Sequence, residues 1–171
     1  MTSPNPLSEG LRLRRRPDPC ALAIFGASGD LTKRKLFPAL YSLAYRHLLP
    51  EQFAVVGVAR SPQTTAQFAA AMKQAVKDFA RDPFRQDVWD SLAKGLRYIA
   101  TEFDSATGED SVAQLLDGCD AQDGTLGNRV FYLAVPPQAF ETVVAEIGER
   151  RERKGWTRVI VEKPFGHDAA S

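Results

Sequence analysis

The chain has 171 residues, of which 44% are apolar and 25% are charged, as is ordinary for one globular domain. Its formal net charge of +1 excludes a general attraction to nucleic acid or to an anionic membrane surface, so any anion site must be local. No apolar run approaches the ~18 residues that a membrane-spanning helix needs. The two cysteines, Cys20 and Cys119, lack metal-ligand spacing, and we expect reduced thiols in a cytoplasmic protein.

The first 18 residues are rich in proline, serine and arginine and contain no apolar segment of the kind found in secretory signals. Because this composition cannot form a packed core, we expect a flexible tail over residues 1–18 and one domain over 19–171. The arginines of the tail leave two alternatives open, an organelle transit peptide or a contact with an anion. They are Arg12, Arg14, Arg15 and Arg16.

Residues 20–25, CALAIF, form a short apolar run that ends at a glycine, which predicts a buried strand of a parallel sheet. The leucines at Leu36, Leu40 and Leu43 then recur at helical spacing and predict a helix from residue 31 to residue 46. Pro38 conflicts with an uninterrupted helix, because proline has no N–H to donate. Either the helix bends there or its regular part begins near Pro38.

The rest of the chain alternates between apolar runs and amphipathic segments. It predicts strands at 53–59, 96–101, 129–135 and 158–162, and helices around 68–79, 86–94, 111–119 and 140–147. This alternation indicates right-handed crossovers and a parallel sheet with helices on both faces, a Rossmann-like doubly wound α/β fold. Ligands of such sheets bind beyond the carboxyl ends of the strands, so the loops after the strands are the candidate sites.

A glycine-rich turn follows the first predicted strand, where residues 24–36 read IFGASGDLTKRKL. Gly26 and Gly29 allow a tight turn and a close approach of backbone to a ligand. The backbone N–H groups from Gly26 onward, aided by the helix dipole, are expected to face a phosphate. Ser28 either donates to that phosphate or shapes the turn, and Asp30 is best explained as a helix cap. An ordinary tight turn between strand and helix is the alternative.

The end of the second predicted strand reads GVARSPQ and lacks the acidic residue that commonly holds the ribose of NAD. Arg60 and Ser61 instead offer a guanidinium and a hydroxyl, which suit a 2′-phosphate. The combination with the glycine turn favours NADP over NAD. A surface arginine at a strand end is the alternative explanation.

Four segments together resemble the amino-terminal part of glucose-6-phosphate dehydrogenases: FGASGDLTKRKLFPALYSL, VVGVARS, NRVFYLAVPP and VIVEKPFGHD. They occur in the family's order, from about residue 20 to the end of the chain. The resemblance implies NADP-dependent oxidation of glucose 6-phosphate to 6-phosphogluconolactone, the entry step of the pentose phosphate pathway, by a homo-oligomeric full-length protein. It also implies that the last strands of the sheet, a second α+β substrate domain and the catalytic histidine lie outside this sequence. Thr32 departs from the family, where alanine is common.

The resemblance assigns a coenzyme role to residues of four loops. These are Gly26, Ala27, Ser28, Gly29, Asp30 and Leu31 at the phosphates, Arg60 and Ser61 at the 2′-phosphate, Glu102 and Phe103 on the adenosine side, and Pro136, Pro137 and Lys163 near the nicotinamide. Lys163 would contact both nicotinamide and sugar, and Lys35 is a second lysine near the substrate. Lys163 also ends a predicted strand before a proline that restricts its backbone, although a lysine at a solvated loop would look the same.

The oxidation needs a base within hydrogen-bond reach of the sugar hydroxyl. His47 is expected far from the ligand edge, and the adjacent side chains of His167 and Asp168 point apart, so we assign no catalytic residue and expect no turnover from this chain alone. An open strand edge should leave the domain only marginally stable. Two alternatives stay open, a sugar oxidoreductase of the glucose–fructose oxidoreductase type and a non-catalytic NADP-binding module.

Overall fold

The computed structural model describes residues 17–102, 106–136, 139–149 and 154–162. Its centre is a five-stranded parallel sheet, in which every strand pairs in parallel with its neighbour in the order β3-β2-β1-β4-β5. The strands are β1 (Cys20–Phe25), β2 (Phe53–Ala59), β3 (Leu96–Ala100), β4 (Arg129–Leu133) and β5 (Thr157–Val161). The chain moves outward from β1 in one direction and then in the other, so the strand order reverses between β1 and β4, which is where such sheets bind ligands.

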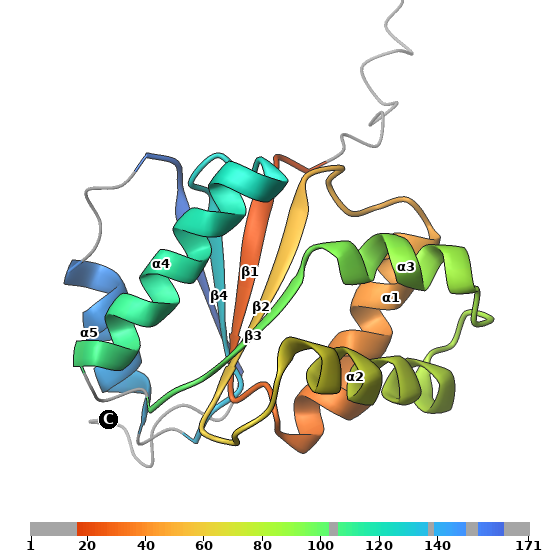
Figure 1. Ribbon diagram of the computed structural model, residues 1–171, viewed down its shortest axis with the longest axis horizontal. Helices are drawn as coiled ribbons and strands as arrows, with labels where there is room; N and C mark the ends of the chain where they lie inside the picture. The colour runs from red at the N-terminus through yellow and green to blue at the C-terminus, as the bar shows by residue number, and fades with distance from the viewer. Residues whose placement is uncertain (1–16, 103–105, 137–138, 150–153, 163–171) are drawn as a thin grey trace, which may run out of the picture.

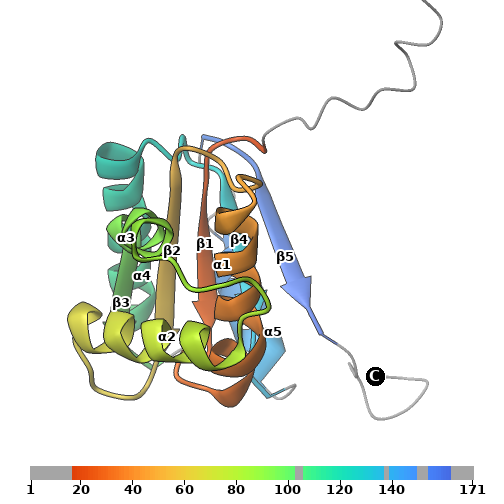
Figure 2. The same ribbon diagram turned by 90° about the vertical axis from the view of Figure 1, so that its right-hand side faces the viewer.

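Helices cover both faces of the sheet, as the alternating sequence pattern predicts (Figures 1 and 2). One face carries η2 (Thr32–Leu36), α1 (Phe37–Tyr45), α2 (Thr65–Phe79) and α3 (Gln86–Lys94), and the other carries α4 (Ala106–Asp123) and α5 (Phe140–Glu149). Each side has its own apolar core, because successive side chains of a strand point to opposite faces. In β1, for example, Ile24 packs toward α1 and α2, whereas Ala23 and Phe25 pack toward α4 and α5.

The first helix is divided where the sequence raised a conflict. A π-helical segment, η2, is closed by a hydrogen bond from the Phe37 amide to the Thr32 carbonyl, five residues back. The regular helix α1 starts only at Phe37, with Pro38 in its first turn. Pro38 has no N–H to donate back into η2, so the regular pattern of hydrogen bonds is interrupted where the π-helical segment meets α1. The helical backbone runs without a break from residue 30 to residue 45, so the prediction of a helix over 31–46 is confirmed, and its regular α-helical part begins near Pro38.

The predicted strands lie within two residues of the observed ones, whereas the helix predicted at 111–119 is too short. The observed α4 has 18 residues. Its central positions Val112, Leu116 and Cys119 are buried in the apolar core, whereas the sequence at both ends of the helix is polar and carries no periodic signal. Strand β5 forms one edge of the sheet, and Val159 and Ile160 are 40% and 43% exposed there. Among the residues that the structure describes, no further strand pairs with the outer side of β5.

Candidate functional site

The glycine turn lies at the carboxyl end of β1, beside the ends of β2 and β4. Gly26 has φ +83°, and a Cβ there would lie 2.2 Å from the carbonyl oxygen of Ala134. Its N–H and that of Ala27 both donate to the Val58 carbonyl, at 2.9 and 3.1 Å, and the Gly29 N–H donates to the Gly26 carbonyl at 2.9 Å. Only glycine satisfies both the backbone angle and the lack of space at position 26.

The same hydrogen bonds correct one expectation about this turn. The amides of Gly26, Ala27 and Gly29 are occupied within the protein, so they shape the turn and do not face a ligand. Within the described part of the chain, the amides of Ser28, Asp30 and Leu31 have no such partner. These three N–H groups are the donors that the turn offers to an anion, at the start of a helix whose dipole favours negative charge.

The start of the following helix is stabilised differently from the prediction. No side chain caps η2, so the capping role predicted for Asp30 is wrong. Its carboxylate instead lies 3.7 Å from the Arg34 guanidinium, and both side chains are exposed. The fully buried Thr32 donates from Oγ1 to the Gly26 carbonyl at 3.5 Å, which links the helix back to the turn.

The three cations of η2 face different surroundings, as neighbours on a helix must. The Arg34 guanidinium lies 5.2 Å from the centroid of the Phe79 ring in α2, so it is drawn toward α2. Lys33 and Lys35 are exposed. Lys35 therefore remains open to a ligand of this edge of the sheet.

The loop after β2 is held against the glycine turn. The Ser61 hydroxyl donates to the Ser28 hydroxyl oxygen at 3.2 Å, which joins the two loops directly. The Ser61 carbonyl accepts a hydrogen bond from the Tyr98 hydroxyl at 2.7 Å. Arg60 is exposed beside this contact, and it forms no ion pair with any other residue that the structure describes. The amides of the turn that have no partner within the described protein and the Arg60 guanidinium thus belong to adjoining loops.

The remaining predicted residues follow other strands of the same edge. Glu102 is exposed just after β3, and its carbonyl accepts from the Thr101 hydroxyl at 3.3 Å. Pro136 is exposed after β4, and its carbonyl accepts from the Ala139 amide at 2.9 Å. Phe103, Pro137, Lys163, His167 and Asp168 lie outside the described residues.

Two tyrosines at this edge were not singled out by the sequence reasoning, Tyr98 in β3 and Tyr132 in β4. The Tyr132 hydroxyl donates to the Glu162 carboxylate after β5. Burial and this hydrogen bond raise the pKa of Tyr132 to about 12. A usable signal was present, because a tyrosine within an apolar strand has a hydroxyl that needs a partner.

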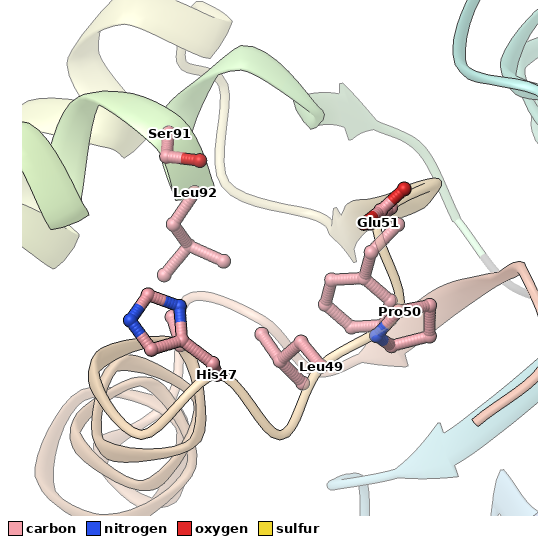
Figure 3. A pocket seen from close by; sticks show the side chains of 8 residues that line it. His47, Leu49, Pro50, Glu51, Ser91 and Leu92 are labelled. Carbon is pink, nitrogen blue, oxygen red and sulfur yellow. The ribbon is translucent and has the colours of Figure 1, made fainter. Parts of the chain in front are cut away.

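A pocket of about 320 Å³ lies at the opposite edge of the sheet (Figure 3). Its wall is partly apolar and partly polar, formed by Ala44, His47, Leu49, Pro50, Glu51, Phe53, Ser91 and Leu92. Phe53 is the first residue of β2, whereas the glycine turn adjoins the last residues of that strand. His47 therefore lies far from the turn, as the sequence suggested.

The described residues contain no helix that could cross a membrane. They also contain no group of three or more histidine, cysteine or carboxylate side chains that could hold a metal ion.

Strand order and turn geometry together define the class of the protein. A parallel sheet that reverses its order beside β1, with a positive-φ glycine turn leading into a helix, is a dinucleotide-binding domain of the Rossmann type. The family model described as "Glucose-6-phosphate dehydrogenase, NAD binding domain" matches residues 23–171. The chain belongs to this family.

Relatives and solved structures agree with the assignment. Glucose-6-phosphate 1-dehydrogenase 2 of Mycobacterium tuberculosis is 43% identical, over 98% of this chain and 34% of the relative. Glucose-6-phosphate 1-dehydrogenase of Chlamydia pneumoniae is 42% identical, over 95% and 33%. A structure of glucose-6-phosphate dehydrogenase in complex with its substrate glucose-6-phosphate matches with a TM-score of 0.76 and 33% identity, over 88% of this chain and 31% of that one. The enzyme from Mycobacterium avium matches with a TM-score of 0.74 and 32% identity, over 89% and 31%. The chain thus spans about a third of the length of the relatives it matches.

Proposed function

We propose that this chain binds NADP at the carboxyl edge of β1 and β2, and that it is the coenzyme-binding part of a glucose-6-phosphate dehydrogenase. The observation that supports this most strongly is the hydrogen bond between the Ser61 and Ser28 hydroxyls, 3.2 Å long. It brings the loop that carries Arg60 next to the turn that offers free amides. A dinucleotide with a 2′-phosphate needs these two features side by side.

Different described residues would bind different parts of the coenzyme. The amides of Ser28, Asp30 and Leu31 would bind the pyrophosphate, which carries the negative charge that a helix start favours. Arg60 would pair with the 2′-phosphate through charge-assisted hydrogen bonds, with the Ser61 hydroxyl beside it. Residues 57–63 contain no carboxylate that would repel this phosphate or hold a bare ribose, which favours NADP over NAD.

The proposed reaction removes a hydride from C1 of glucose 6-phosphate and a proton from its C1 hydroxyl, giving 6-phospho-D-glucono-1,5-lactone and NADPH. Bound NADP supplies the hydride acceptor. The contribution of this chain is to bind and orient the coenzyme, and the family resemblance implies that Lys163 contacts the nicotinamide and the sugar, with Lys35 near the substrate. Its described histidine, His47, lies at the other edge of the sheet and cannot take the proton. We therefore expect no turnover from the isolated chain.

Calorimetric titration of the chain with NADP and with NAD tests the proposal. We expect saturable binding of NADP that is tighter than binding of NAD. Arg60→Ala should raise the Kd for NADP by about tenfold to a hundredfold, as expected for lost hydrogen bonds to a charged group, and should change the Kd for NAD little. Arg81→Ala is the matched control, because Arg81 is also an exposed loop arginine.

Two results would contradict the proposal. The first is the absence of saturable NADP binding to the folded wild-type chain. The second is an Arg60→Ala variant that binds NADP as tightly as the Arg81→Ala control. Steady NADPH production by the isolated chain with glucose 6-phosphate would refute the separate expectation of no turnover.

A further inference from the structure

The loop that carries Arg60 is fixed by a hydrogen bond from Tyr98, a buried tyrosine of the neighbouring strand β3. We propose that Tyr98 is a positioning residue that sets the preference for NADP over NAD, by fixing this loop against the glycine turn. The inference rests on the proposed function, since it concerns how the same site recognises the 2′-phosphate.

The space for the Tyr98 ring is created by a glycine. Tyr98 of β3 is the register partner of Gly57 in β2. A Cβ on Gly57 would lie 2.8 Å from Cε1 of Phe68 and 3.0 Å from Cδ2 of Tyr98, so a side chain there would displace both rings. With glycine present, the two ring centroids lie 4.8 Å apart, and Tyr98 is only 8% exposed. The ring is thus locked in the core, and its hydroxyl has a defined position.

From this position, Tyr98 anchors both ends of the segment that joins β2 to α2. Its hydroxyl donates to the Ser61 carbonyl at 2.7 Å, and its backbone N–H donates to the Thr65 hydroxyl oxygen at 3.1 Å. The carbonyl of Ala59, the residue before Arg60, accepts a hydrogen bond from the Thr101 amide at 2.9 Å. The backbone on either side of Arg60 is therefore held by β3, while the guanidinium stays exposed.

A hydrogen bond between Ser61 and Ser28 links this loop to the glycine turn, on the side of the site proposed for the pyrophosphate. Ser61, whose carbonyl is held by Tyr98, donates from its hydroxyl to Ser28 in the glycine turn at 3.2 Å. Tyr98, Ser61 and Ser28 thus form a connected path from the core to the turn. A preorganised guanidinium binds its phosphate without a cost for ordering the loop. Only NADP has a phosphate at this place, so loss of order should weaken NADP binding more than NAD binding.

Tyr98→Phe is the direct test, because it removes the hydroxyl and keeps the ring. We expect the Kd for NADP to rise about threefold to tenfold, the range for one lost hydrogen bond, with less than about a twofold change for NAD. Tyr41→Phe is the matched control. The Tyr41 hydroxyl is also buried, donates to the Pro83 carbonyl at 2.9 Å and accepts from the Arg85 amide at 2.7 Å. Tyr41→Phe should lower the free energy of unfolding at least as much as Tyr98→Phe does, and it should leave the ratio of the Kd values for NADP and NAD unchanged.

The outcomes separate the inference from the proposed function. If the wild type prefers NADP and Tyr98→Phe keeps the same ratio, or weakens both coenzymes equally, the positioning role is wrong and the proposed function stands. If the wild type binds neither coenzyme, the proposed function itself fails.

Hydrogen exchange of the wild-type chain provides a second test, which needs no substitution. NADP should slow hydrogen exchange of residues 98–101 more than NAD does, because coupling between two parts of a site is reciprocal. Equal protection by both coenzymes would also overturn the inference.

Discussion

Replacement of Gly26 by alanine is the sharpest test of how the turn is built. The backbone at this position has φ +83°, which costs a residue with a Cβ about 1–2 kcal/mol. The added Cβ would also lie 2.2 Å from the Ala134 oxygen and 2.8 Å from its carbonyl carbon, so the end of β4 must move away from β1. Overpacking of this kind costs about 1–3 kcal/mol. Together these effects should lower the free energy of unfolding by about 2–5 kcal/mol.

Urea denaturation followed by circular dichroism measures this loss, and titration with NADP measures its effect on the site. Gly118→Ala is the control, because Gly118 lies in α4 and an added Cβ there would meet nothing within 4 Å. Alanine in a helix interior should raise the free energy of unfolding by about 0.5–1 kcal/mol. We expect Gly26→Ala to weaken NADP binding more than tenfold at temperatures where it remains folded, because the free amides follow position 26 directly. A Gly26→Ala variant as stable as the wild type, with unchanged NADP affinity, would refute this account of the turn.

Two further predictions concern residues that support the fold around the site. Partial burial favours the neutral form of Asp120, but hydrogen bonds from Arg129, Thr125 and the Gly127 amide outweigh it and hold the pKa of Asp120 at about 2. This pKa lies below that of an unfolded aspartate, so its stabilisation is complete above pH ~4 and is lost as pH falls toward 2. Urea midpoints of the wild type and Asp120→Asn should therefore converge between these pH values, and a constant difference would contradict the assignment. Thr32→Val, which removes the hydrogen bond to the Gly26 carbonyl and keeps the shape, should lower the free energy of unfolding by about 0.5–1.5 kcal/mol.

Much of the secondary structure was predictable because buried strands of parallel sheets have nearly continuous apolar sequences. The runs at 20–25 and 53–59 coincide with β1 and β2, and residues 86–94 coincide with α3. The π-helical segment was not predictable, because its hydrogen bond from Phe37 to Thr32 leaves no characteristic residue pattern. The true length of α4 was hidden as well, since the sequence at its two ends is polar and has no apolar periodicity.

The amino-acid sequence by itself determined the chemical groups of the candidate site. A glycine turn, an arginine and a serine after the second strand, and the lack of a carboxylate there are local features that need no knowledge of distant contacts. Tertiary structure alone decided which amides of the turn are free, because the Val58 carbonyl from β2 takes up those of Gly26 and Ala27. It also decided that Ser61 meets Ser28, 33 residues away, and that Tyr98 meets Ser61, 37 residues away. The order β3-β2-β1 creates these contacts, and strand order depends on packing of the whole sheet, which short-range sequence patterns do not encode.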